Sequence, residues 1–250
     1  MSLPTWTPAA LSSSARAYAG PAWRFVEAQH RVATLKLVDG LAEQALLEQV
    51  LEDSKPALPP ECAGLDYLLA TPFRYGAVYP QGSRFRRAGR TEGVFYAAEQ
   101  PDTALAEIAF YRLLFFAESP GTPFPANAAD YTAFSVELST AAAIDLTALP
   151  FSQDDAAWTA PVDYAACQAL AETARSAGLE LIRYRSVRDP ARGAALAVLT
   201  CRAFARPAPS DRQTWQIRIG ATGVQAICDF PRRRLEFRRA DFAADPRLAS

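Results

Sequence analysis

Four arginines crowd one short stretch of this sequence. Residues 82–93, GSRFRRAGRTEG, contain Arg84, Arg86, Arg87 and Arg90. Guanidinium groups bind phosphate oxygens in bidentate fashion, and several that repel one another need counter-charge to be ordered. The cluster as a whole therefore favours a site for an anionic ligand, although a single arginine in such a loop is more often part of a solvated turn.

Two further polar side chains follow the arginines. Tyr96 lies in the strand-like run VFYAAE, where alternation places it on the same face as Val94. A lone strand tyrosine is usually part of the core. Glu107 lies in the second turn of the helix-like run PDTALAEIAFYRLLFF, beside its apolar stripe. It either pairs with Arg112 or lies on the surface, or it faces the arginine loop across the strand-to-helix turn.

A serine stands in the later stretch LELIRYRSVRDPARG. Ser186 precedes a turn that contains Asp189 and Gly193. A serine nucleophile needs a base nearby, and the chain has one histidine, His30, and no GxSxG motif. Ser186 is therefore expected either to bond within its own turn or to hydrogen-bond a ligand or orient a carboxylate.

Composition and motifs exclude several classes of function. The net charge is -1, from 26 basic and 27 acidic residues among 250, whereas a general nucleic-acid binder usually has a basic excess. Neither GxGxxG nor GxxxxGK[ST] occurs. No run is apolar enough to span a bilayer, and the N-terminus does not resemble a signal peptide. A cytoplasmic protein without direct nucleic-acid or membrane contact is expected.

The cysteines indicate neither a zinc site nor a disulfide framework. Cys62, Cys167, Cys201 and Cys228 are far apart and form no CxxC pair. They are expected to be small buried side chains in a reducing compartment. No metal is predicted, because His30 has no ligand-type partner near it in the sequence.

The elements that position these residues fall into two parts. Helices are predicted from Pro21 to Gly40 and from Leu41 to Pro56, and this part is assigned to residues 1–69. Residues 70–250 are expected to be an α+β domain, because the strand-like runs cluster late and are not separated by regular helices. The predicted strands are Val94–Ala98, Tyr131–Leu138, Ala194–Phe204, Trp215–Ile219, Val224–Asp229 and Leu235–Phe237; the predicted helices are Pro101–Phe116 and Val162–Ala177.

The order of these motifs resembles the RES-domain family, named for an arginine, a glutamate and a serine. The family's first motif, G-G-R-W-N-x-x-G, stands here as GSRFRRAG, and its spacing singles out Arg84. The family tyrosine then falls on Tyr96, the glutamate on Glu107 and the serine on Ser186. In this chain a serine, a phenylalanine and an arginine replace the second glycine, the tryptophan and the asparagine of the motif. The resemblance covers roughly residues 70–205, and the N-terminal segment resembles the helical extension of longer members.

The resemblance implies an ADP-ribosyltransferase-like core of antiparallel sheets flanked by helices. It also implies the toxin of a toxin–antitoxin pair, which consumes NAD+ as substrate. Arg84 would hold the pyrophosphate, with Arg74, Arg86 and Arg188 as secondary phosphate ligands. Tyr96 and Ser186 would contact the nicotinamide or its ribose, or fix the glutamate. Glu107 would stabilise the oxocarbenium-like centre.

Three functions stay open at this level. The first is cleavage of the nicotinamide–ribose bond with phosphate or water as acceptor, and the second is ADP-ribosylation of a target protein. The third is a non-catalytic nucleic-acid-binding module, which the net charge of -1 disfavours. The expected partner is an Xre-like antitoxin that covers the active site. The expected assembly is a homodimer or a toxin–antitoxin hetero-oligomer.

Overall fold

A mixed sheet flanked by helices forms the framework of the computed structural model. It describes residues 6–28, 37–75, 80, 82–89 and 92–249. His30 lies outside these residues. Within them, eight strands form one sheet in the order β1-β2-β5-β4-β3-β6-β7-β8. The strands are β1 (Arg16–Glu27), β2 (Phe95–Ala98), β3 (Ala129–Asp145), β4 (Leu181–Arg185), β5 (Ala194–Val198), β6 (Asp211–Gly220), β7 (Gly223–Cys228) and β8 (Arg233–Arg238).

The long strand β3 joins the two halves of this sheet. Its first residues pair with β6, and its last residues, Ala143–Asp145, pair in parallel with β4. All other pairings are antiparallel. Strand β1 pairs with both β2 and β3, so β1, β2, β5, β4 and β3 form a closed ring, from which β6, β7 and β8 extend. The mainly antiparallel sheet agrees with the expected mixed architecture.

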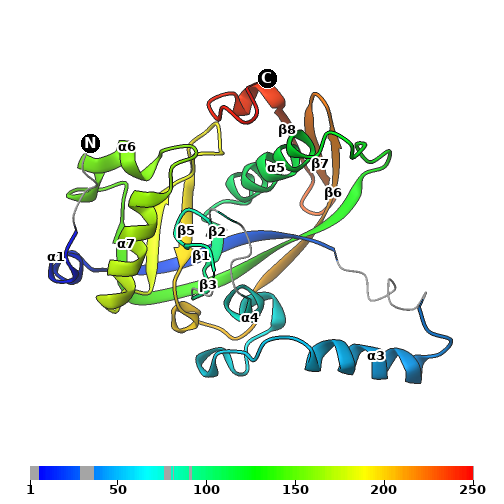
Figure 1. The fold of residues 1–250 in the computed structure, drawn as a ribbon, viewed down its shortest axis with the longest axis horizontal. Coiled ribbons are helices and arrows are strands. Elements are labelled where there is room, and N and C mark those ends of the chain that lie inside the picture. The colour runs from blue at the N-terminus through cyan, green and yellow to red at the C-terminus, as the bar shows by residue number, and fades with distance from the viewer. Residues whose placement is uncertain (1–5, 29–36, 76–79, 81, 90–91, 250) are drawn as a thin grey trace.

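Two helices cover the two halves (Figure 1). The helices of the described residues are α1 (Pro8–Ser13), α3 (Leu41–Asp53), α4 (Tyr67–Arg74), α5 (Pro101–Glu118), α6 (Asp155–Trp158) and α7 (Ala165–Ser176). Helix α5 packs Leu105 and Phe110 into one core with Trp215 and Phe237 of the β6–β8 extension. Helix α7 packs on β4 and β5 in a second core. Between these two helices lies the segment that carries Ser186.

Helix α5 begins where the sequence predicts. Pro101 occupies its first turn, where a missing N–H costs nothing and the fixed φ suits a helix. Apolar residues surround α5 on nearly every side, and nine of its residues are buried. A helix that is hydrophobic all round belongs in a core, which is why Glu107, on this helix, is held in an apolar setting.

The helix predicted from Pro21 to Gly40 is wrong over its first residues, and positions 29–36 of that range lie outside the described residues. Residues Arg16–Glu27 form β1, which pairs with β3 from Arg16 to Glu27. The aromatic and β-branched residues Trp23, Phe25 and Val26 suit a strand, and the partner strand lies more than 100 positions away, beyond the reach of local periodicity. The N-terminal part therefore contributes a strand to the central sheet, whereas α3 forms as predicted from Leu41.

The other predicted elements are confirmed in type and position, although β3 and β6 are about twice as long as predicted. Strands β2, β3, β6, β7 and β8 and helices α5 and α7 overlap their predicted ranges. Residues Ala194–Phe204 form only the short strand β5, followed by a 3-10 turn at Cys201–Ala203. Strand β4, which precedes Ser186, was not among the predicted strands.

All four cysteines are buried, as expected, but two of them are not free thiols. Cys62 and Cys201 form a disulfide with a Cα–Cα distance of 5.6 Å. The expectation of four reduced cysteines is therefore wrong for this pair, which the fold brings together across 139 positions. No helix within the described residues has both the length and the apolar character needed to cross a membrane.

Candidate active site

A hydrogen bond joins Glu107 of α5 to Ser186, which follows β4. The Ser186 hydroxyl donates to Glu107 Oε1 at 2.5 Å. Ser186 Oγ accepts in turn from the backbone N–H groups of Arg188 (3.2 Å) and Asp189 (3.0 Å). These two donors leave the hydroxyl proton directed at the carboxylate. Ser186 is completely buried, and it thus fixes one oxygen of a half-buried carboxylate.

The Ser186 turn is fastened to α5 by a second contact. The Thr103 hydroxyl donates to Asp189 Oδ2 at 2.8 Å, and the same oxygen accepts from the N–H of Gly193 at 3.1 Å. The Ser186 N–H donates to the Gly193 carbonyl at 2.8 Å. The turn therefore closes on itself and lies directly against the first turn of α5, which sets the position of Ser186 relative to Glu107.

Gly193→Ala is expected to disturb this junction. A Cβ at Gly193 would lie 2.1 Å from Thr103 Oγ1 and 2.8 Å from Asp189 Oδ2, so the turn must move away from α5. We expect the free energy of unfolding to fall by about 1–3 kcal/mol, as measured by chemical denaturation. Gly121→Ala is the control, because a Cβ there meets nothing within 4 Å. Equal stability of the two variants would contradict the tight junction.

Arg84 is buried on the other side of the site. Its Nη1 donates to the carbonyl oxygens of Trp158 (2.8 Å) and Ala160 (3.0 Å), at and beyond the end of α6. Its guanidinium also lies over the ring of Tyr164, 4.9 Å from the ring centroid. Arg84 therefore binds two carbonyls at a helix end, of which that of Trp158 also accepts from the Cys167 thiol at 3.5 Å, while its charge acts on Glu107.

Tyr96 fixes the loop that carries Arg84. Its hydroxyl lies 2.8 Å from the hydroxyl of Ser83 and accepts from the N–H of Phe85 at 2.9 Å. Burial raises the pKa of Tyr96 to about 12, so the phenol is neutral at physiological pH. The loop turns sharply at Gly82, where φ is +66° and a Cβ would lie 2.2 Å from the Arg86 carbonyl. Ser83, the departure from the family glycine, thus supplies a partner for Tyr96.

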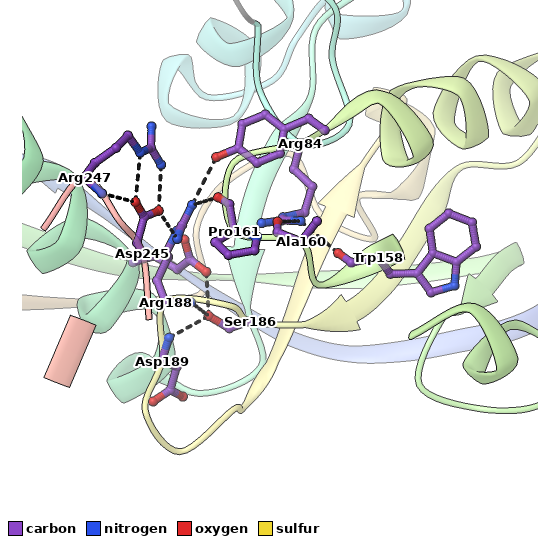
Figure 2. A network of polar contacts seen from close by, with 11 residues as sticks. Arg84, Trp158, Ala160, Pro161, Ser186, Arg188, Asp189, Asp245 and Arg247 are labelled. Carbon is purple, nitrogen blue, oxygen red and sulfur yellow. Dashed lines mark hydrogen bonds and ion pairs between the residues drawn. The ribbon is translucent and has the colours of Figure 1, made fainter. Parts of the chain in front are cut away.

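Arg188 lies in a network that extends to the end of the described chain (Figure 2). Its Nη1 donates to Asp245 Oδ2 at 2.6 Å, and its Nη2 donates to the Tyr164 hydroxyl at 3.1 Å. Its guanidinium carbon lies 3.9 Å from the ring centroid of Phe110. Arg247 holds the same carboxylate through Nε (3.0 Å) and Nη2 (2.9 Å).

The surroundings of Glu107 shift its pKa in both directions. Burial raises the pKa of Glu107, and the Ser186 hydrogen bond together with the charges of Arg188 and Arg84 offsets part of that rise. The neighbouring carboxylate of Asp189 adds to it. Glu107 is consequently a carboxyl whose pKa lies above its usual range, because burial outweighs the favourable hydrogen bond and charges.

The remaining predicted phosphate ligands, Arg74 and Arg86, make their contacts away from Glu107 and Ser186. Arg74 of α4 binds Glu52 of α3 and the carbonyl of Pro56. Arg86 donates to the carbonyl of Tyr75. A cleft of about 240 Å³ lies between the arginine loop and α7, and its lining includes Arg86, Arg87, Glu172 and Arg175. The cleft does not include Glu107, Ser186 or Arg84.

Sequence reasoning missed several residues of this site. Trp158 and Ala160 act through backbone carbonyls, which no motif reveals. Tyr164 and Asp245 stand far from Ser186 in the chain, and no spacing connects them with it. No group of three metal-ligating side chains that could hold a metal ion occurs within the part of the chain that the structure describes.

Comparison with known proteins gives one family match. The model of the RES domain matches residues 58–219, well over half of the chain. Among solved structures, the fold is similar to that of the M. tuberculosis MbcT–MbcA toxin–antitoxin complex. The TM-score is 0.44 at 13% sequence identity, over 96% of this chain and 97% of that chain. A comparison with curated proteins gives no match.

Proposed function

This chain belongs to the RES domain family, and on that premise we propose that it is the cytoplasmic toxin of a type II toxin–antitoxin pair. Its proposed reaction is cleavage of the nicotinamide–ribose bond of NAD+, with phosphate or water as acceptor. The core would then be ADP-ribosyltransferase-like. The observation that carries the proposal is the 2.5 Å hydrogen bond between Ser186 and Glu107, set between the charges of Arg84 and Arg188.

The proposed reaction begins with loss of the leaving group. The C–N bond between ribose and nicotinamide breaks, its electron pair goes to the ring nitrogen, and nicotinamide leaves as a neutral molecule. Positive charge develops on the ribose C1′ and O4′. The Glu107 carboxylate, fixed by Ser186, stabilises this charge electrostatically, which in a dry site is often the largest single contribution to catalysis.

The acceptor then completes the reaction. A phosphate oxygen attacks C1′ and gives ADP-ribose 1-phosphate, or a water molecule attacks and gives ADP-ribose after losing a proton. A nucleophilic side chain of a target protein would instead give an ADP-ribosylated protein. The same site residues support all three outcomes, because each acceptor attacks the same C1′ centre once nicotinamide has left.

Arg84 is the proposed ligand of the NAD+ pyrophosphate. A guanidinium has five N–H donors, and Nη1 alone serves both carbonyl acceptors. Tyr96, as a neutral phenol, keeps the Arg84 loop in place, and it is also the proposed neighbour of the nicotinamide ribose. Arg86 and Arg188 are proposed as secondary sources of positive potential for the phosphates, and Arg74 as a more distant one.

The proposed antitoxin would cover an aromatic surface beside Glu107. Tyr111 and Phe115 follow Glu107 at intervals of four residues, on the same face of α5. Their exposed fractions are 47% and 49%, which is high for large aromatic side chains on a helix that buries half of its residues. An Xre-like antitoxin placed there would exclude NAD+ from Glu107.

Expression in bacterial cells tests the toxin proposal. Induction of the wild-type chain is expected to stop growth while total cellular NAD+ falls, measured by enzymatic cycling in cell extracts. Blotting for ADP-ribose on cellular proteins separates transfer to a protein from cleavage. Growth arrest with unchanged NAD+ and no labelled protein would contradict the proposed chemistry, and the absence of growth arrest would contradict the toxin role.

The pH dependence of NAD+ cleavage follows from the raised pKa of Glu107. The carboxylate is the active form, so kcat is expected to rise with pH as Glu107 ionises. The midpoint should lie above about 4.3, the value of an ordinary glutamate, and Ser186→Ala should raise it further, since the Ser186 hydrogen bond lowers the pKa. Steady-state rates between pH 4 and pH 9 provide the measurement. A midpoint that moves down in Ser186→Ala would contradict this assignment.

A further inference from the structure

Asp245 is a buried carboxylate on the C-terminal side of the sheet, and the chemistry described so far does not use it. Its exposed fraction is 2%. Oδ2 accepts from Arg188 and Arg247, and Oδ1 accepts from the Nε and the backbone N–H of Arg247. The neighbouring side chains Phe242 and Leu248 are anchored in the core beside α5. The carboxylate is therefore held in one position.

Asp245 is an anion at neutral pH. Burial by itself raises its pKa, but the hydrogen bonds from Arg247 and the charge of Arg188 outweigh burial and lower the pKa below its usual range. Removing one partner from a buried ion pair leaves the other charge without compensation. For Asp245, that other charge is Arg188.

Arg188 is adjacent to the catalytic carboxylate in two ways. Its backbone N–H donates to Ser186, which holds Glu107. Its guanidinium lies on Phe110, one turn of α5 beyond Glu107. The charge of Arg188 already lowers the pKa of Glu107. A guanidinium this near could pair with Glu107 itself, and such a pair would neutralise the charge that stabilises the oxocarbenium centre.

We propose that Asp245 is a positioning residue, which holds the Arg188 guanidinium on the C-terminal segment and away from Glu107. The inference rests on the proposed function of Glu107. The terminal nitrogens of Arg188 donate to Asp245 and to the Pro161 carbonyl, as Figure 2 shows, and also to the Tyr164 hydroxyl. Without Asp245, the carboxylates left near Arg188 are Glu107, whose pKa its charge already lowers, and Asp241, which lines the same small cavity but is paired with Arg238.

The other charged or titratable groups that face Glu107 are the same in the wild type and in a variant of Asp245. They are Arg84 from the loop before β2, Asp189 from the turn after β4, Tyr184 of β4 and Tyr111 of α5. Tyr111 exposes part of its side chain, but desolvation of its phenol group and the negative charge of neighbouring groups raise its pKa, and burial raises that of Tyr184, well above neutrality, so neither phenol changes its charge between pH 4 and pH 9. A change in the titration of Glu107 on substitution of Asp245 therefore reports on the charge balance of the Asp245–Arg188 pair, to which Tyr164 also belongs, since it accepts from Arg188 and its pKa is lowered in spite of its burial.

Asp245→Asn is the test, with Asp241→Asn as its matched control. Asp241 lies in the same segment but pairs with Arg238. In Asp245→Asn, we expect the acid limb of the kcat profile to move to lower pH by roughly one unit. The value of kcat at its plateau should fall about tenfold, with KM within about twofold, because charge stabilisation and not binding is lost. Asp241→Asn should match the wild type. Equal profiles in all three proteins, or equal shifts in both variants, would overturn the inference.

A direct titration separates this inference from the proposed function. NMR of protein labelled with 13C at the glutamate carboxyl, with Glu107→Gln for assignment, follows Glu107 whether or not NAD+ is cleaved. A lower pKa of Glu107 in Asp245→Asn supports the inference even if the wild type proves inactive. An unchanged pKa overturns it even if the wild type cleaves NAD+.

Arg247→Met covers the case in which Asp245→Asn does not fold. In this variant Arg188 is the remaining arginine partner of Asp245, and one positive charge is removed. The pKa of Glu107 should then stay constant or rise, whereas a fall would overturn the inference.

Discussion

Glu107→Gln is expected to lower the rate of NAD+ cleavage by about 10²- to 10³-fold. This is the usual cost of removing one electrostatic group that acts on the transition state. Glutamine keeps the size of the side chain and can still accept a hydrogen bond from Ser186, so the loss isolates the negative charge. The decay of NAD+ and the appearance of nicotinamide, followed by chromatography, measure it.

The same substitution should not destabilise the protein at neutral pH. Burial raises the pKa of Glu107, so the folded state binds its proton more tightly than the unfolded state does. The resulting stability is present below the unfolded pKa and is lost as pH rises through the folded pKa. Above that range Glu107→Gln should be as stable as the wild type or more stable. A large loss of stability would contradict a catalytic rather than structural role.

Glu118→Gln supplies the control for both measurements. Glu118 lies on the exposed end of the same helix, so the substitution removes an equal charge without touching the site. Cleavage by Glu118→Gln should stay within about twofold of the wild type, in line with the small effects of surface substitutions. Cleavage by Glu107→Gln at a similar level would contradict the proposed role of Glu107.

Arg84→Ala is expected to have the second largest effect, on both binding and stability. Truncation leaves the Ala160 carbonyl without its donor and the Trp158 carbonyl with only the weak Cys167 thiol, which costs about 1–3 kcal/mol of the free energy of unfolding. Loss of the charged hydrogen bonds to the pyrophosphate should weaken NAD+ binding about tenfold or more. Chemical denaturation and the KM for NAD+ are the two measurements.

Arg84→Lys separates the two parts of this prediction. A lysine keeps the charge but cannot form the planar, bidentate contact of a guanidinium, so KM should stay raised. Arg87→Lys is the matched control in the same loop, since Arg87 is exposed and pairs with Glu172 of α7. A KM for Arg84→Lys equal to that of the control would exclude Arg84 as a pyrophosphate ligand.

Local patterns were sufficient to predict much of the fold and the family. The alternation of apolar residues in Trp215–Ile219 and the proline-initiated helix at Pro101 are local signals, and both elements formed as predicted. The order of arginine, tyrosine, glutamate and serine motifs predicted the RES domain family, which the family match confirms. These signals hold because each depends on residues close together in the chain.

Long-range pairing explains what the sequence did not reveal. Residues Arg16–Glu27 form a strand because β3 pairs with them along their whole length. The spacing of apolar residues within this segment gives no information about such a distant partner. Asp245 binds Arg188 across 57 positions, and Arg84 binds backbone carbonyls 74 and 76 positions away. Local periodicities and motifs cannot predict contacts over such distances in the chain, so these contacts are known only from the folded structure.

Incubation of the purified protein with NAD+, with and without phosphate, tests the central claim most directly. Mass spectrometry distinguishes ADP-ribose, ADP-ribose 1-phosphate and a mass-shifted protein. The account predicts that the wild type releases nicotinamide together with ADP-ribose, or with ADP-ribose 1-phosphate when phosphate is present, and that Glu107→Gln releases neither at a comparable rate. Intact NAD+ after prolonged incubation of the wild type under both conditions, with no mass-shifted protein, would contradict it.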